Sequence, residues 1–489
     1  MSRLLHWLDE RLDMRGAKGA LLDREVPARL TWWHTLGSAT LTAFTIQVVT
    51  GIVLATYYSP SPDHAYESIR FIDRQVLSGA LLRGMHHWGA SAMVVLILAH
   101  LIRVFSVGAY KYPREINWLV GVGLLFLVLA FSFTGYLLPW DQKAYWATAV
   151  GTNIAGTTPL LGAKLGTLLR GGAELGAATL TRFYAFHVLW FPGLLGLLVL
   201  VHLVILVRQG IAPRPHALED GAPARTNDPA YPAYYRTAYA ATKRAGVRFW
   251  PDIVGKDAIV ALGVVAVIVL LALALGAPLE APADPTDTAY VPRPEWYFLP
   301  LYQLLKLVPG SLESLVAIGV PTALVVALIA LPFFDRRSTR NLLHRPLGMG
   351  VLVLVLGGSG LLIGAAVRSE GPTVPPEVGR PLSSRERAGR ALFQSQQCVG
   401  CHKILGKGGD EGPDLTQVGL RHSSAWLHSY IELPTRFHPE SRMPAYGPPA
   451  LSHEEIEELA EYVATLRGKG GPEAQPQFVD TFPEAPKPK

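Results

Sequence analysis

Two apolar segments, residues 83–105 and 181–210, limit what this chain can fold into more than any other feature of its sequence. Each is long enough to cross a lipid bilayer as a helix, because about 20 apolar residues span the hydrocarbon core. Each segment has one histidine near each of its ends: His86 and His100 in the first, His187 and His202 in the second. A helix turns every 3.6 residues, so both histidines of a helix lie on nearly one face, about 21 Å apart.

The rest of the composition agrees with a membrane protein. Half of the 489 residues are hydrophobic, and the net charge of +6 is small, with no basic patch that would indicate nucleic acid. The basic residues are concentrated in the N-terminal segment and in three loops, which all lie on one side if the N-terminus is cytoplasmic. We therefore predict an all-α, seven-span transmembrane bundle with spans at roughly 33–56, 80–105, 116–138, 184–207, 257–277, 313–333 and 347–367.

This topology pairs the four histidines by depth. His86 and His187 lie near the outer surface, and His100 and His202 lie near the inner surface. An imidazole in hydrocarbon is costly unless it is paired or ligated, and two matched pairs are hard to explain by packing. Two such helices can hold two flat macrocycles, so we predict two non-covalent haem b groups with these histidines as axial iron ligands. Ligation by two histidines favours electron transfer over oxygen binding.

Two further sets of residues fit such haems. The first and third spans contain glycines at matching separations, which would let a macrocycle edge approach the backbone: Gly37, Gly51, Gly121 and Gly135. Taken singly, each is better explained by ordinary helix packing. Arginines at span ends could hold haem propionates: Arg83, Arg103, Arg114 and Arg182. For the inner two, anchoring at the cytoplasmic surface is an equal alternative.

A carboxylate lies at an outer membrane boundary in the sequence PRPEWY, where Glu295 stands between Pro294 and Trp296. A carboxylate in an aromatic pocket of low dielectric constant can exchange protons. Without other context, a turn in the aromatic belt explains this motif better.

The C-terminal part has a different character. Residues 369–383 are rich in proline and read as a linker, and residues 384–468 form a predicted small helical domain. Within it, Cys398, Cys401 and His402 form the attachment motif of a c-type haem, with two covalent thioethers and one axial histidine. Met443 is the predicted second axial ligand, because the domain has no other methionine. Residues 469–489 are predicted to be disordered.

Together, the histidine pairs, the glycines, LPWDQ at 138–142, TLTRFY at 179–184 and PEWY at 294–297 resemble cytochrome b of the cytochrome bc complexes. The resemblance covers about residues 1–368 and is to the branch in which a four-helix cytochrome b and a three-helix subunit IV are separate chains. Residues 384–468 resemble class I cytochrome c. The expected domains are an interfacial amphipathic helix (1–30), a dihaem cytochrome b domain (31–244), a subunit IV-like domain (245–368), the linker (369–383), the cytochrome c domain (384–468) and the tail (469–489).

The resemblance implies a subunit of a quinol–cytochrome c reductase in a bacterial inner (cell) membrane, with the cytochrome c domain outside. Quinol oxidation at an outer site would involve Glu295 and Tyr297. One electron would go to a Rieske iron–sulfur partner and on to the c haem, and the other through the b haems to quinone inside. Soluble cytochrome c or a terminal oxidase would follow, and a homodimer is expected. Two other readings remain: a dihaem membrane anchor that relays electrons without bifurcation, and a simple electron-transfer module.

Overall fold

The structure is a computed structural model. It describes residues 19, 22–27, 30–285, 293–368, 382–396, 398–404, 407–408, 411–468 and 476–480. The chain divides into two compact units, residues 1–283 with 294–368 and residues 284–293 with 369–489. Within the second unit, Asp284 forms an ion pair with the buried side chain of Arg390.

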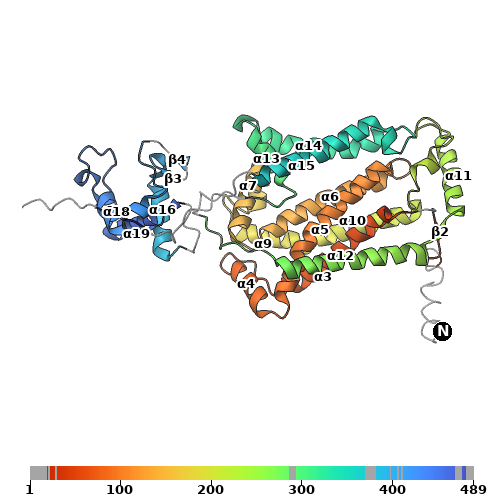
Figure 1. Ribbon diagram of the computed structural model, residues 1–489. Coiled ribbons are helices and arrows are strands. Elements are labelled where there is room, and N and C mark those ends of the chain that lie inside the picture. The colour runs from red at the N-terminus through yellow and green to blue at the C-terminus, as the bar shows by residue number, and fades with distance from the viewer. Residues whose placement is uncertain are drawn as a thin grey trace, which may run out of the picture. The chain divides into compact units, whose positions relative to one another are not determined.

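The first unit is a bundle of long helices that lie side by side (Figure 1). Seven helices in the described residues are long and apolar enough to cross a membrane, which confirms the predicted multi-pass bundle. They are α3 (Leu36–Ala55), α5 (Gly79–Ser106), α6 (Glu115–Tyr136), α9 with α10 (Ala177–Ala185, Phe191–Gln209), α12 (Val254–Leu275), α14 (Gly310–Phe334) and α15 (Pro346–Arg368). Their apolar side chains are largely exposed on the outside of the bundle, as a lipid-facing surface requires.

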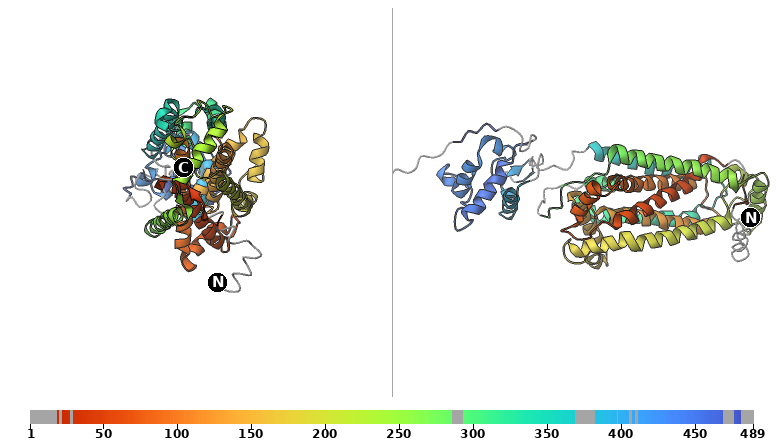
Figure 2. Two further views of the ribbon diagram at one scale, coloured as in Figure 1. Left: turned by 90° about the vertical axis from the view of Figure 1, so that its right-hand side faces the viewer. Right: turned by 90° about the horizontal axis from the view of Figure 1, so that it is seen from below.

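Packing within the bundle has a clear centre. Helix α3 packs along α5 and α12, and α6 packs against α10. The core between these helices includes Ala43, Val94, Leu124 and Leu195, which are all buried. Two further views show the same long helices from the end and from below (Figure 2).

Shorter elements close the two ends of the bundle. At one end, called here the α7 end, lie α4, α7, α8 and α13 (Ala65–Gln75, Gln142–Gly156, Gly162–Arg170 and Leu299–Leu307). At the other end, called the α11 end, lie α11 (Tyr231–Arg244) and the two-residue strands β1 (Glu25–Val26) and β2 (Val247–Arg248). Strand β1 pairs with β2, so this part of the predicted interfacial helix over 1–30 is extended rather than helical. Most of residues 1–21 lie outside the described residues.

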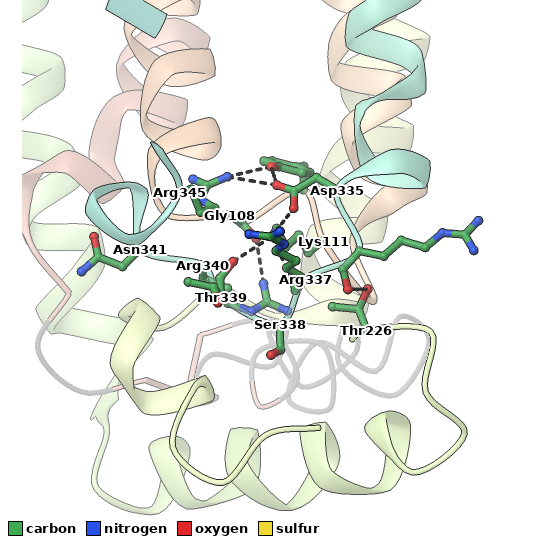
Figure 3. A network of polar contacts seen from close by, with 12 residues as sticks. Gly108, Lys111, Thr226, Asp335, Arg337, Ser338, Thr339, Arg340, Asn341 and Arg345 are labelled. Carbon is green, nitrogen blue, oxygen red and sulfur yellow. Dashed lines mark hydrogen bonds and ion pairs between the residues drawn. The ribbon is translucent and has the colours of Figure 1, made fainter. Parts of the chain in front are cut away.

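A buried polar network ties the loop after α5 to the loop between α14 and α15 at the α11 end (Figure 3). The Arg340 guanidinium donates to the backbone carbonyl oxygens of Gly108 and Tyr112 at 2.7 and 2.8 Å. Lys111 Nζ lies 2.9 Å from a carboxylate oxygen of Asp335. These contacts join the first four spans to the last two, alongside the apolar packing of Leu328 and Leu331 on Tyr110 and Trp118.

The second unit is small and helical, as expected for residues 384–468. It contains α16 (Ser384–Ser395), α17 (Val418–Arg421), α18 (Ser424–Glu432), α19 (His453–Ala464) and the paired strands β3 (Lys403–Ile404) and β4 (Lys407–Gly408). Helices α16 and α19 each begin with a serine whose hydroxyl accepts from the backbone N–H of a glutamate three residues later. They pack on one another around Phe393, Ile456 and Leu459.

Part of the tail has a defined place. The N–H groups of Gln477 and Val479 donate to the backbone carbonyls of Leu420 and Arg421, at 2.9 and 2.8 Å. The carboxylate of Asp480 accepts from Ser423 Oγ at 2.6 Å. Backbone pairing and this carboxylate thus place residues 476–480 against the domain. The other tail residues lie outside the described residues.

Candidate functional site

The structure brings the four predicted histidines together in two pairs. The ring centroids of His86 on α5 and His187 in the fourth span lie 6.1 Å apart. Two imidazoles that share one metal have centroids roughly 6 Å apart, because each metal–nitrogen bond is about 2.0–2.1 Å long. At the other depth, His100 and His202 lie within electrostatic range of each other. The pairing matches the one expected from the loop charges.

Hydrogen bonds orient the rings of the first pair. His187 Nδ1 lies 3.1 Å from the carbonyl oxygen of Phe131, and since a carbonyl only accepts, Nδ1 carries the proton. His86 Nδ1 lies 2.9 Å from the Thr50 hydroxyl, which donates its own hydrogen to the Ile46 carbonyl. Both Nδ1 atoms thus act as donors, and each Nε2 keeps a free lone pair. This is how metal-ligating histidines are held.

A local change in helix geometry accompanies the unequal histidine spacings. Residues Phe186–Trp190 form a π-helical turn, in which the N–H of Phe191 bonds to the carbonyl of Phe186. A π turn accommodates one extra residue in a helix. The spacing in the fourth span is one residue longer than in α5, so this turn absorbs the difference. Apart from that difference in spacing, nothing in the sequence indicated the turn.

Each of the four predicted glycines faces one of the four histidines. A Cβ atom at Gly135 would lie 2.4 Å from His187 Cε1, and one at Gly51 would lie 3.2 Å from His86 Cε1. At the other depth, Cβ atoms at Gly37 and Gly121 would lie 3.5 and 3.6 Å from the Cε1 atoms of His100 and His202. The group next to each missing side chain is therefore an imidazole. At Gly135 a Cβ could be accommodated only if the ring shifted, and at Gly51 the ring would have to give by a few tenths of an ångström, whereas the distances at Gly37 and Gly121 are ordinary contacts.

The four arginines that were predicted to bind haem propionates differ in their hydrogen-bond partners. Arg83 Nε lies 2.6 Å from Asp73 Oδ1, and the Arg114 guanidinium donates to the Tyr235 hydroxyl at 2.7 Å. Arg182 donates to the carbonyl of Leu168. In contrast, Arg103 Nε and Nη2 are buried without a partner among the described residues. An anionic group such as a propionate would satisfy these unpaired donors.

Glu295 lies at the α7 end and has a partner that the sequence did not indicate. Lys143 Nζ is 2.8 Å from Glu295 Oε1, and both side chains are largely buried. Trp296 and Tyr297 pack against the core between the spans. Burial raises the pKa of the Tyr297 hydroxyl, and the nearby Glu295 carboxylate raises it further. Lys143 directly follows LPWDQ, so its position next to that motif was the only available signal.

In the second unit, the predicted c-type motif lines a cavity of about 250 Å³. Its walls include Cys398, His402 and Met443, together with the apolar side chains of Leu415 and Leu459. His402 Nδ1 lies 2.9 Å from the carbonyl oxygen of Pro413, so Nδ1 donates and Nε2 is available to a metal. Burial raises the pKa of the Cys398 thiol to about 11. The residues present therefore fit a covalently held haem with axial histidine.

Three family models match successive parts of the chain. Residues 21–210 match the model of cytochrome b/b6/petB, residues 282–373 match that of the C-terminal part of cytochrome b/b6/petD, and residues 386–467 match cytochrome c. The cytochrome b and cytochrome c families imply b haems and a covalent c haem.

Known proteins resemble the chain in the same parts. The menaquinol:cytochrome c reductase cytochrome b subunit of Bacillus subtilis is 44% identical over 220 residues, which cover 43% of this chain and 98% of that protein. Cytochrome b6 of Synechococcus elongatus is 39% identical over 212 residues, 43% of this chain and 99% of that protein. A chain of a solved hyperthermophilic respiratory Complex III superposes with a TM-score of 0.64 and 28% identity, covering 75% of this chain and 92% of that one.

These matches agree with the histidine pairs, the glycines that face them and the c-type motif. The chain therefore belongs to the cytochrome b/b6 family, and it joins the N-terminal and C-terminal parts of that family in one polypeptide that ends in a cytochrome c domain.

Proposed function

We propose that this chain is the cytochrome b and cytochrome c subunit of a membrane quinol–cytochrome c reductase. The observation that carries the proposal is the pair of histidine sites at two depths, each histidine backed by a glycine. Two similar proteins are a menaquinol:cytochrome c reductase cytochrome b subunit and a chain of a respiratory Complex III. They support menaquinol as the quinol that the complex oxidises.

In this proposal His86 and His187 hold one b haem, and His100 and His202 hold the other. The hydrogen bonds from Nδ1 of His86 and His187 keep their Nε2 atoms available to iron. Cys398 and Cys401 hold the c haem covalently, with His402 and Met443 as its axial ligands. When bound, these groups supply one-electron redox centres. Arg103, with its unpaired buried donors, is the best placed of the four arginines to bind a propionate.

The residues at the α7 end form the proposed quinol oxidation site. Oxidation of a quinol releases two protons and two electrons, so the site needs a group that accepts a proton. The Glu295 carboxylate is that group, and Tyr297 lies beside it in the same turn. Of the two electrons, one goes to a Rieske iron–sulfur partner and on towards the c domain. The other is passed across the bundle towards quinone at the α11 end, where two such electrons, from two quinol oxidations, and two protons reduce one quinone.

We infer the orientation from the charges at the two ends. The α11 end has Arg336, Arg337, Arg340 and Arg345 in the loop between α14 and α15, so it faces the cytoplasm of a bacterial cell. With seven candidate spans, the cytochrome c domain would then lie outside, where it would serve or replace a separate soluble cytochrome c on the way to an oxidase. The complex is proposed to be a homodimer in its assembled form.

Redox difference spectra of the purified complex test the cofactors. The expected result is two b haems and one c haem per chain, with covalently bound haem confined to residues 384–468. A menaquinol analogue should then reduce the c haem in a reaction that an inhibitor of the outer quinol site blocks. A dihaem anchor without bifurcation would instead show quinol-reducible b haems and no inhibitor-sensitive reduction of the c haem, and that result would exclude the reductase.

A further inference from the structure

Among the described residues, Lys143 is the side chain in hydrogen-bond contact with the Glu295 carboxylate. The two groups come from parts of the chain 152 residues apart, and Lys143 Nζ lies 2.8 Å from Glu295 Oε1. The Lys143 side chain is 25% exposed and that of Glu295 is 19% exposed. Partial burial makes such a charge pair stronger than one at a free surface, but it leaves the carboxylate accessible.

The backbone on the lysine side is firmly fixed. Asp141 caps α7 by accepting from the N–H of Ala144 at 2.8 Å, and its other carboxylate oxygen accepts from the N–H of Glu280 at 3.0 Å. The N–H of Gln142 donates to the carbonyl of Ala281 at 2.9 Å. Trp140, just before this cap, has a φ of 52°, a left-handed conformation that costs about 1–3 kcal/mol in a residue other than glycine. Helix α7 therefore begins directly after a strained backbone conformation at Trp140.

An aromatic ring also helps to position the lysine side chain. Lys143 Nζ lies 5.4 Å from the centroid of the Tyr136 ring, within the range of a cation–π interaction. The ammonium therefore contacts an aromatic face on one side and the Glu295 carboxylate on another. By comparison, Glu295 lies in a turn where its own carbonyl accepts from the N–H of Phe298. The lysine is the fixed member of the pair, and the carboxylate lies at the start of a turn.

We propose that Lys143 is a positioning residue of the quinol oxidation site, which holds the Glu295 carboxylate ionised and aimed between successive deprotonations of quinol. The proposal rests on the proposed function. A neighbouring cation favours the charged form of a carboxylate, so Glu295 stays ready to accept a proton. When that proton arrives, the attraction to Lys143 is lost and the neutral side chain is free to leave the pair.

Other charged and titratable groups face this pair. His87 on α5 interacts electrostatically with both Glu295 and Lys143, and Arg83 acts on His87 from the same helix. Tyr297 faces Glu295 from its own turn, and Asp141 interacts with Lys143. Among these, Lys143 alone is in hydrogen-bond contact with the carboxylate in the described residues. Its removal should therefore have the dominant effect on the charge state of Glu295.

The test is the pH dependence of quinol oxidation in the purified complex, measured as reduction of the c haem by a menaquinol analogue. In Lys143→Met, loss of the cation should move the acid limb of the rate profile to higher pH by about one unit, so that the rate on that limb is about tenfold lower. The rates should converge with those of the wild-type complex at high pH. Lys143→Arg should keep the wild-type profile, because the charge is retained.

Two controls separate charge from structure. Lys164→Met removes an exposed lysine on the neighbouring helix α8 and should leave the profile unchanged. If Lys143→Met does not assemble with a normal haem content, Lys143→Gln is measured in its place. A double variant with Glu295→Gln should show no further shift.

The outcomes distinguish the two proposals. A wild-type complex that does not oxidise quinol would remove the proposed function. If the wild-type complex oxidises quinol, the positioning role is tested by the pH profile of Lys143→Met. A profile that is unchanged, or lowered equally at every pH, would overturn that role.

Discussion

The two ends of the bundle each contain a lysine–carboxylate pair that joins the first four spans to the later ones. At the α7 end Lys143 lies 2.8 Å from Glu295, and at the α11 end Lys111 lies 2.9 Å from Asp335. The distances are nearly equal, but the surroundings are not. The comparison separates a pair that holds the protein together from a pair that is left free to change its protonation.

The α11 pair is fully integrated into the network of Figure 3. Lys111 has no exposed side-chain surface, and it also donates to the carbonyls of Arg337 and Thr339 at 2.8 and 2.7 Å. Asp335 additionally accepts from the Tyr110 hydroxyl and, at 3.3 Å, from Arg345. Burial acts to raise the pKa of Asp335, but the hydrogen bonds from Tyr110 and Lys111 outweigh it and hold the pKa below its usual value.

The α7 pair has one contact where the α11 pair has several. Glu295 accepts only from Lys143 among the hydrogen bonds of the described residues. A group that must accept and release protons cannot be held by several donors at once, because each donor stabilises only the charged form. We infer that the same chemistry serves stability at one end of the bundle and catalysis at the other.

The comparison first predicts opposite results for the two carboxylates. Glu295→Gln removes the proton acceptor, so quinol oxidation should fall by about 10²–10⁴-fold, the usual contribution of general base catalysis. The melting temperature of the complex should change little, because only one contact is lost. Steady-state reduction of the c haem by a menaquinol analogue measures the rate. Glu313→Gln, at an exposed carboxylate on α14, is the matched control; a normal rate in Glu295→Gln would end the assignment.

Asp335→Asn should do the reverse. Without the carboxylate, the buried Lys111 and Arg345 cations have no counter-charge, and breaking a buried pair costs about 3–5 kcal/mol. The complex should unfold at a lower temperature, followed by loss of the b haem spectrum on heating, while the rate per assembled complex stays close to normal. Glu67→Gln, which breaks an exposed pair with Arg70, should cost less than about 1 kcal/mol. Equal stability of the two variants would contradict the network's role.

The glycines extend the comparison to the two histidine sites. In Gly135→Ala the new Cβ would lie 2.4 Å from His187 Cε1, so the ring must move, at a cost of about 1–3 kcal/mol. In Gly121→Ala the Cβ would lie 3.6 Å from His202 Cε1, which is an ordinary contact. Redox titration of the b haems should show a lower content or an altered signal for one haem in Gly135→Ala only. Similar spectra in both variants would show that the site of His86 and His187 is no more tightly packed than the site of His100 and His202.

The spans, the depth of the histidines and the glycines opposite them could be predicted from the sequence, because all of these follow from helical period and loop charge. The roles of these residues as ligands remain predictions. The periodicity of one segment, however, does not show which distant segment it meets. Lys143 and Glu295 are brought together by tertiary packing alone, and the same is true of Lys111 and Asp335. The π turn at His187 could not be predicted either, because it forms only in the folded helix, where it accommodates one extra residue.

The smallest expected change, taken per pH unit, concerns the charge of Lys111. Burial lowers the pKa of its ammonium from 10.5 to about 8, although the hydrogen bond to Asp335 opposes this. Between these two values the folded protein has released the proton and the unfolded chain still holds it. The unfolded state then binds more protons, so this group makes the free energy of unfolding rise with pH, by at most about 1.4 kcal/mol per pH unit for one proton.

Melting temperatures of the wild-type complex and of Lys111→Met, measured between pH 7.5 and 10, give the contribution of this one group as the difference between two slopes. The wild-type slope should be the more positive, because only that protein has a buried lysine to discharge. Asp335 adds nothing to the difference, since its lowered pKa keeps it ionised throughout this range. Parallel slopes would mean that burial does not oppose the charge of Lys111, and that the α11 pair stays fully ionised over this pH range.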